Sequence, residues 1–205
     1  MKNTEPHSKL NMFAQIRSLS KSSAILLCSA LIQRMLPNYL LFCELTDFSD
    51  ANRNAQWPDV AKNLVNLLWE VSTNKAMKLN VDVQMEKLEE ITPDVQLYDN
   101  LGAYAALDFC MALHASYQLI SNEEPNEAVT VAKLSQGSVE RHIMGLEDKE
   151  LTGAELKAHP LMQYEIDSLK ALFDFCEQKG IQSQDIKALR KDIIDSGVSS
   201  LGIEF

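Results

Sequence analysis

Glycine and proline are scarce in this sequence, with 7 and 6 residues respectively in a chain of 205. Turn-rich β architectures use both residues heavily, so their scarcity argues against such a fold. The four cysteines, at positions 28, 43, 110 and 176, contain no CxxC pair and lie in apolar stretches with helical spacing. They are typical of small buried residues in a reducing compartment and not of a disulfide framework. We therefore expect a cytoplasmic protein.

Long hydrophobic runs are also missing. The most apolar segment, Ala24–Ile32, is far shorter than the roughly 20 residues of a membrane span, and Gln33 and Arg34 follow it. The 23 residues before it already carry a helical pattern, which makes them too long and too structured for the start of a signal peptide. We expect no membrane partner.

Basic residues are outnumbered, with 19 Lys and Arg against 29 Asp and Glu, for a net charge of −10. Nucleic acids and anionic membranes are polyanions, so we expect no nucleic-acid partner overall. The charge is uneven, because the first 34 residues hold five basic side chains and one acidic one. We interpret this segment as a slightly basic helix pair on an acidic body. The alternative is a face that meets an acidic partner or another subunit.

The apolar residues of the sequence recur mainly with the period of an α-helix. Apolar residues recur at i, i+3/i+4 and i+7 along most of the chain, and Pro37, Pro58, Pro125 and Pro160 stand where helices could begin. We predict a single all-α domain over residues 1–205, a bundle of roughly eight helices, with residues 1–8 as a candidate disordered segment. The expected helical segments are about 9–19, 23–35, 38–45, 57–71, 81–91, 101–121, 125–144, 152–158, 160–179 and 183–196.

Several residues mark expected helix ends. Asn80 is positioned as an N-cap, and Thr152 with Glu155 forms a capping box. Gly180 is expected to cap the C-terminus of one helix and Ser183 the N-terminus of the next. After the last helix, Leu201, Ile203 and Phe205 alternate, which predicts a short extended C-terminal tail that docks on the bundle.

An acidic helix face is the first candidate site. Asp82, Glu86 and Glu89 are spaced by four and three residues, so they share one side of a helix, with Glu90 beside them. Clustered carboxylates attract Mg²⁺ or Mn²⁺, and Glu44 and Asp47 upstream could complete such a site. The competing interpretation is a solvated acidic face that Lys78 and Lys87 partly neutralise.

Asp108 is the second candidate, because it lies within an apolar helical stretch. A buried carboxylate must be paired, hydrogen-bonded or protonated. Arg34, Tyr104 or a helix N-terminus could be its structural partner, whereas a ligand-binding role would make it a site. Weaker ligand-binding candidates are Arg34, Tyr39 and Glu70.

Cys110 and His114, one turn apart, could form half a metal site or a Cys/His pair. Packing explains the two residues more simply, because zinc needs further ligands and only three other histidines exist in the chain.

A family resemblance covers nearly the whole chain. The segments that carry it are Arg34–Cys43, Leu68–Glu70, Asn80–Glu90 with Pro93, Tyr104–Asp108 with Cys110, and Leu201–Phe205. In the same order they resemble the YjaG-like proteins of proteobacteria, a family classed as a domain of unknown function. The resemblance implies an all-helical cytoplasmic protein and carries over no activity, cofactor or catalytic residue.

No complete catalytic motif is present, since the sequence lacks GxSxG, HExxH and a Gly-rich phosphate loop. We therefore expect a non-catalytic helical protein, without cofactor, that binds an unknown protein partner or itself. The alternative is a Mg²⁺- or Mn²⁺-dependent nucleotide or phosphoester hydrolase that uses Asp82, Glu86 and Glu89. A small-molecule sensor with Asp108 in a pocket lies between the two.

Overall fold

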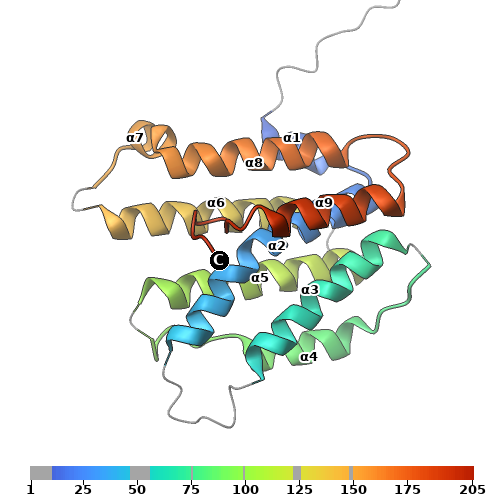
Figure 1. Cartoon of the computed structure of the whole chain (residues 1–205), viewed down its shortest axis with the longest axis horizontal. Helices are drawn as coiled ribbons and strands as arrows, with labels where there is room; N and C mark the ends of the chain where they lie inside the picture. Colours follow the sequence, from blue (N-terminus) through green and yellow to red (C-terminus); the bar gives the residue numbers. More distant parts are fainter. Residues whose placement is uncertain (1–10, 47–55, 75, 99, 122–125, 148–149) are drawn as a thin grey trace, which may run out of the picture.

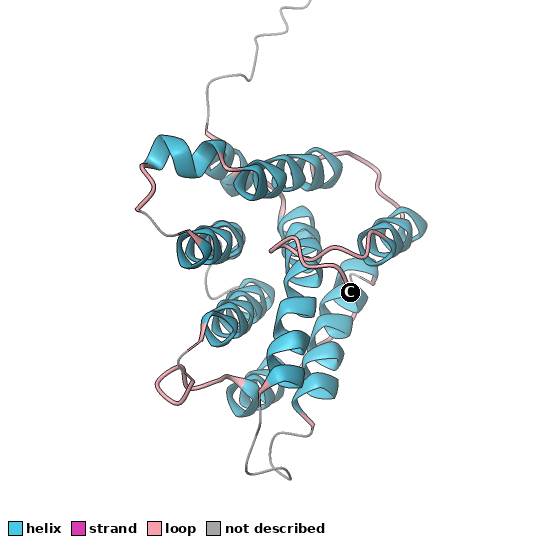
Figure 2. Cartoon of the chain, turned by 60° about the vertical axis from the view of Figure 1, so that its left-hand side comes forward, coloured by secondary structure: helices cyan, strands magenta, loops and turns pink. Residues whose placement is uncertain are grey.

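The computed structural model describes residues 11–46, 56–74, 76–98, 100–121, 126–147 and 150–205. Nine helices lie in these ranges, which confirms the all-α prediction, and Figure 2 shows them joined by loops. They are α1 (Met12–Arg17), α2 (Lys21–Leu45), α3 (Trp57–Thr73), α4 (Val81–Ile91), α5 (Leu101–Ser121), α6 (Glu127–Leu146), α7 (Gly153–Ala158), α8 (Pro160–Cys176) and α9 (Ser183–Asp195). The predicted disorder over 1–8 falls outside the described residues.

Helix α2 is the centre of the fold. It crosses the molecule diagonally (Figure 1) and contacts α3, α5, α6, α8 and α9. It is long and apolar enough to cross a membrane, but 83% of its most apolar window is buried inside the protein. A helix that is apolar on all sides is expected when other helices surround it, so α2 has the character of a core helix.

Pro37 does not end a helix. The sequence predicted separate helices over 23–35 and 38–45, and this was wrong, because α2 continues through Pro37 to Leu45. Proline removes one backbone donor and its ring crowds the carbonyl one turn earlier. Leu36 and Tyr39 on either side are buried in the core. Tertiary packing therefore holds the two halves in one helix despite the local penalty.

Two predicted helix starts are confirmed. The Asn80 side chain accepts a hydrogen bond from the Val83 N–H at the start of α4. Thr152 and Glu155 form the predicted capping box of α7, each side chain bonding to the other residue's backbone N–H. These signals depend only on neighbouring residues, so the sequence alone suffices to place them.

Two predicted caps are displaced. Helix α8 ends at Cys176, so Gly180 lies in the turn beyond it, where its φ of 81° suits glycine. The N-cap of α9 is Gln182, and Ser183 is the first helical residue. Both shifts are small, because loop residues between two adjacent helices offer several alternative caps.

The C-terminal tail, residues 198–205, docks on α2 as expected. Val198 and Glu204 form an antiparallel bridge, and Gly202, with a φ of 72°, turns the chain between them. The Ser200 N–H donates to the Arg34 carbonyl at 2.8 Å, which ties the tail to α2. The tail is therefore extended at its ends and bent in its middle.

Helices α4, α5 and α6 position the candidate site. Helix α5 packs against α2 on one side and against α4 and α6 on two others. The α5 and α6 helices run antiparallel, because Asp108 meets Arg141 near one end and Gln118 and Glu127 share the other. Each of the four cysteines is free and buried, as the sequence predicted. Burial raises the pKa of the Cys28 and Cys176 thiols to about 12, so both stay protonated at neutral pH.

Candidate functional site

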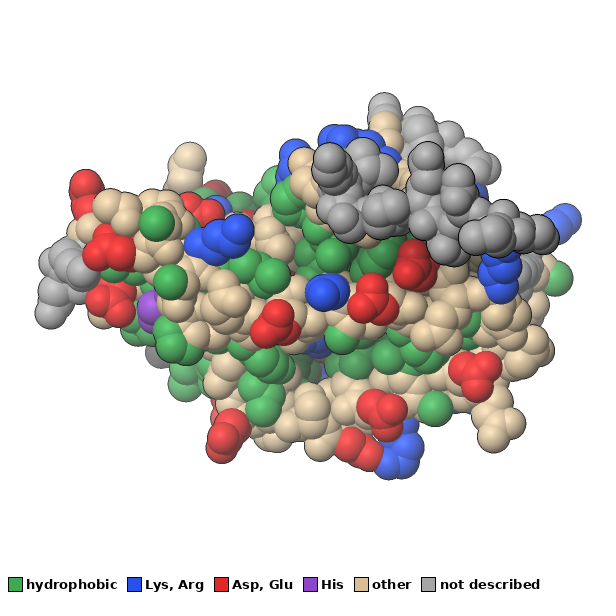
Figure 3. All heavy atoms as spheres, turned by 90° about the horizontal axis from the view of Figure 1, so that it is seen from above, with side chains coloured by type: hydrophobic (Ala, Val, Ile, Leu, Met, Phe, Trp, Pro, Cys, Tyr) green, Lys and Arg blue, Asp and Glu red, His purple; other side chains and the backbone are tan. Residues whose placement is uncertain are grey.

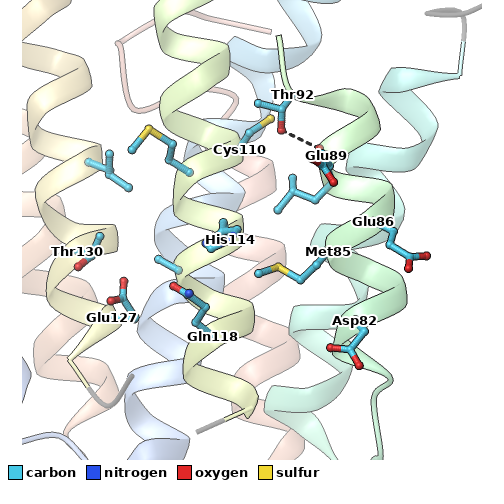
Figure 4. A pocket seen from close by; sticks show the side chains of 14 residues that line it. Asp82, Met85, Glu86, Glu89, Thr92, Cys110, His114, Gln118, Glu127 and Thr130 are labelled. Carbon is cyan, nitrogen blue, oxygen red and sulfur yellow. Dashed lines mark hydrogen bonds between the residues drawn. The ribbon is translucent and has the colours of Figure 1, made fainter. Parts of the chain in front are cut away.

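A groove of about 740 Å³ lies over α5, between α4 and α6. We call it the α5 groove. Figure 4 shows it from close by, with α5 between the two flanking helices. Its apolar and small lining residues are Met85, Leu88, Cys110, Met111, Ala115 and Leu134, and its polar ones are Asp82, Glu86, Glu89, Thr92, His114, Gln118, Glu127 and Thr130. An apolar floor with polar edges is typical of sites that bind other molecules.

The floor is a face of α5 that stays open to solvent. Exposed or half-exposed side chains recur along it with steps of three and four, a pattern that we call the α5 stripe. It consists of Tyr104, Leu107, Met111, His114 and Gln118, of which the last three line the groove and the first two continue beyond it. Such spacing places side chains in a line along a helix, as in a seam that receives a neighbouring helix. Met111, at the middle, is 47% exposed, which is unusual for a large apolar side chain of a central helix.

The rim of the groove is acidic. Asp82, Glu86 and Glu89 lie along α4, and Glu127 lies at the start of α6 across the groove. The expected neutralisation by Lys78 or Lys87 is not formed, since neither lysine makes an ion pair with these carboxylates in the described part of the chain. The rim carboxylates therefore have no ion-pair partner in the described part of the chain.

The three α4 carboxylates do not converge on one point. Figure 4 shows Met85 pointing toward α5, whereas Glu86 points to the opposite side of α4. Within the described ranges, no group of three or more His, Cys, Asp or Glu side chains is close enough to hold a metal ion. Asp47 lies outside the described residues. Metal binding by Asp82, Glu86 and Glu89 stays a prediction without geometric support.

Cys110 and His114 both line the groove, as their spacing predicted. They differ in accessibility, because the Cys110 thiol is buried and donates to the Ile91 carbonyl at 3.8 Å, whereas His114 is exposed. Burial also raises the pKa of the Cys110 thiol. A protonated, buried thiol is a poor nucleophile and metal ligand, which favours packing as the role of Cys110.

Asp108 forms an ion pair that the sequence did not predict. Its carboxylate accepts a hydrogen bond from Arg141 Nη1 of α6 at 2.5 Å. The Arg141 guanidinium also lies over the Tyr104 ring, 5.4 Å from its centroid. Arg34 was one of three partners considered for Asp108, and it pairs with Glu165 instead. Arg141 thus joins α6 to α5 where the stripe reaches Tyr104.

The pH dependence of stability provides a test of the Asp108 environment. Burial raises the pKa of the carboxyl, and the Arg141 charge and hydrogen bonds from Arg141 and Ser138 oppose this only in part. The folded protein therefore binds this proton more tightly than the unfolded chain, and the resulting stability is present below about pH 4, near the ordinary aspartate pKa. It is lost as the pH rises through the folded-state pKa.

We expect Asp108→Asn to reduce this loss of stability between pH 4 and pH 7, because asparagine is uncharged at both pH values. Urea unfolding of the two proteins at intervals across that range measures the difference. A variant that instead becomes progressively weaker than the parent as the pH rises would show that the ion pair with Arg141 outweighs burial.

Arg34 belongs to a buried polar cluster beneath α8. Its Nη1 donates to Glu165 Oε2 at 2.6 Å, and the Ser135 hydroxyl donates to the other Glu165 oxygen at 2.5 Å. Glu165 is fully buried. The Asn38 amide donates to the Ser200 hydroxyl of the tail at 3.0 Å. These contacts join four distant segments, so Arg34 serves the interior and does not face the groove.

Tyr39 and Glu70 also lie away from the groove lining. Tyr39 is fully buried, and its hydroxyl donates to the Ile91 carbonyl at 2.8 Å. Glu70 is exposed on α3, where its charge acts on the Arg190 guanidinium of α9. No ion pair or hydrogen bond joins any two of Asp108, Arg34, Tyr39 and Glu70 in the described structure. These contacts therefore do not link the four residues to one another, and a ligand-binding role for any of them stays a prediction.

Sequence reasoning missed the floor of the groove. The sequence predicted a central α5 that is apolar nearly all round, which did not distinguish Met111 from the core, and neither Leu134 nor Glu127 was singled out. The available signal was the row at 104, 107, 111, 114 and 118, which carries the polar residues His114 and Gln118 within an otherwise mostly apolar helix. Periodicity alone does not say whether such a row faces another helix or solvent.

Other hollows have a different character. Figure 3 looks onto the face that carries α8 and shows acidic and basic side chains interspersed beside hydrophobic patches. A hollow of about 370 Å³ between the end of α8 and α9 is lined by Phe175, Ile181 and Leu189 together with Lys179, Asp185 and Asp192. It mixes both signs of charge, whereas the charged residues that line the α5 groove are all acidic.

Comparisons with known proteins agree with the fold. A family model described as a protein of unknown function, DUF416, matches residues 11–204. The uncharacterised protein YjaG of Salmonella typhimurium is 35% identical over 181 residues, which cover 86% of this chain and 88% of the relative. An uncharacterised Haemophilus influenzae protein is 33% identical over 195 residues, covering 93% and 95%. The crystal structure of a DUF416 family protein from Shewanella baltica matches with a TM-score of 0.83 and 32% identity over 96% of this chain and all of that one.

Proposed function

This chain belongs to the DUF416 family of proteins of unknown function, and from that premise we propose that it is a non-catalytic protein that binds a helical segment of a partner protein in the α5 groove. The observation that carries the proposal is the α5 stripe, a line of exposed side chains on a central helix. Helices α4 and α6 flank its Met111–Gln118 part as walls, which is the geometry of helix-in-groove recognition.

The length of the stripe suits a short helix. From Tyr104 to Gln118 the rise is about 21 Å at 1.5 Å per residue. A partner helix of about 14 residues would cover it, with apolar anchors at i, i+3/i+4 and i+7. Met85, Met111 and Leu134 supply the apolar contact surface, and methionine side chains adapt readily to different partners.

The metal-dependent hydrolase has less support than binding. The carboxylates of Asp82, Glu86 and Glu89 do not converge, and Cys110 is a protonated, buried thiol. We also propose a cytoplasmic location, which the four buried free cysteines support. Self-association through the same groove is the competing form of the binding proposal.

A helical probe peptide tests the function. We would use a 14-residue amphipathic helix with leucine anchors on one face and glutamine elsewhere, and measure binding by fluorescence polarisation. Met111→Glu is expected to weaken binding at least about tenfold, because a carboxylate would be buried without a partner. Ile194→Glu on α9 is the matched control, since Ile194 is 43% exposed and lies outside the groove lining. Equal affinity of both variants would contradict the proposal.

The melting temperature in the presence of Mn²⁺ distinguishes the binding proposal from the hydrolase. A metal that binds only the folded state raises the melting temperature. We expect millimolar Mn²⁺ to raise it no more than NaCl of equal ionic strength. A larger rise that disappears in Glu86→Gln with Glu89→Gln would favour the hydrolase.

A further inference from the structure

We infer that the occupant of the α5 groove is a cationic amphipathic helix whose backbone passes close to Gly137 of α6. The inference rests on the proposed function and adds the chemical class of the partner. Two independent features carry it. One is the negative charge of the rim, and the other is Gly137 of α6, a glycine that packing within this chain does not require.

The rim gives the sign of the partner's charge. Asp82, Glu86 and Glu89 along α4 and Glu127 on α6 are the charged residues among the described lining, although the Glu86 side chain points away from α5 (Figure 4). None of them has an ion-pair partner in the described part of the chain. Like charges one turn apart on α4 repel each other. Lysine or arginine side chains on both edges of a docked helix would relieve this repulsion and also raise the association rate.

Gly137 marks where the partner comes closest. It lies in the interior of α6, where glycine is less favourable than alanine by about 1 kcal/mol. A Cβ at Gly137 would meet no atom within 4 Å, so packing inside this chain does not require glycine there. Its spacing places it on the same face of α6 as Leu134 and Arg141, which border the groove and the α5 stripe. A glycine on this face allows the backbone of another helix to approach.

Arg141 closes the far end of the stripe. Its guanidinium is held between the Asp108 carboxylate and the Tyr104 ring, and its side chain remains 45% exposed. The Asp108 carboxylate pairs with this charge, so the unpaired charges of the site are the carboxylates of its rim.

Two probe peptides test the charge of the partner. Both are 14 residues long with identical leucine anchors, and they differ only in carrying lysine or glutamate at the flanking positions. We expect the lysine peptide to bind at least about tenfold more tightly at 50 mM NaCl, with the gap narrowing at 300 mM. Replacing Asp82, Glu86 and Glu89 together with lysine is expected to reverse the preference, and the melting temperature of this triple variant is measured alongside to show that it is folded.

Gly137→Ala tests the point of approach. We expect the free protein to melt at a higher temperature, because alanine favours the helix and meets open space, while the lysine peptide binds several-fold more weakly. Gly153→Ala in α7 is the matched control, since its added Cβ also meets nothing within 4 Å, and it should leave peptide binding unchanged. Unchanged binding in Gly137→Ala would overturn this part of the inference.

The outcomes separate the two proposals. Equal binding of both peptides, still lost in Met111→Glu, would overturn the cationic partner and keep the groove. If neither peptide binds, the proposed function fails and the inference fails with it. A dimer in sedimentation that dissociates in Met111→Glu would make a second copy of this chain the occupant and overturn the cationic helix.

Discussion

Replacing Glu165 with alanine is expected to lower the free energy of unfolding by about 3–5 kcal/mol, because it leaves the Arg34 charge buried without its partner. Glu165 is fully buried and accepts hydrogen bonds from both Arg34 and Ser135. For a chain of this size the loss corresponds to a melting temperature lower by about 6–20 °C. Urea unfolding at pH 7 and calorimetry measure the two quantities.

Two further variants sharpen this test. Lys191→Ala removes the exposed ion pair with Asp195 on α9 and is expected to leave stability almost unchanged, because solvent screens such pairs. Replacing both partners, Arg34→Met with Glu165→Leu, should recover most of the loss, since no buried charge is then stranded. A Glu165→Ala protein as stable as Lys191→Ala would show that the buried pair contributes nothing.

Tyr39→Ala is expected to have a comparable effect, a loss of about 3–5 kcal/mol, because it opens a cavity in a fully buried region. The ring packs 4.8 Å from that of Phe109, centroid to centroid, and the hydroxyl bonds to the Ile91 carbonyl at the end of α4. Tyr39 therefore connects α2 to α4 and α5, two of the three helices that form the groove. Equilibrium unfolding in urea checks the expected value.

Conservative variants separate packing from hydrogen bonding at this site. Tyr39→Phe keeps the ring and removes the bond to Ile91, for an expected loss of about 1–3 kcal/mol. Tyr117→Phe is a natural companion, since its hydroxyl donates to the Leu64 carbonyl at 2.9 Å in an equally buried place. If Tyr39→Ala proved nearly as stable as the parent but lost peptide binding, the predicted ligand-binding role of Tyr39 would be restored.

Features set by neighbouring residues were predictable from the sequence. The Asn80 cap and the Thr152–Glu155 capping box depend on hydrogen bonds within one turn, so their residues suffice to identify them. The Pro37 error has the opposite cause. A proline penalty of a few kcal/mol is visible locally, whereas the burial that offsets it comes from helices distant in sequence.

The pairing of charges could not be predicted for the same reason. Arg34 and Glu165 are 131 residues apart, and nothing in a single sequence links them. The one available signal was the position of Glu165 on the apolar face of α8, between Met162 and Leu169. The candidate site was likewise predictable in one part and not in another. The acidic face at Asp82–Glu89 was predicted, but its relation to α5 emerges only when α4 and α6 are placed on either side.

The buried cluster around Arg34 sets an order of events during protein synthesis. Translation adds about 5–20 residues per second, so Glu165 is made roughly 7–26 s after Arg34. Until then α2, the central helix, carries the Arg34 charge without its Glu165 partner at the point where α8 will dock. The nascent chain is therefore unable to complete its core from the N-terminal helices alone. A ribosome stalled before α8 would hold a chain whose central helix is not yet covered by α8 and α9.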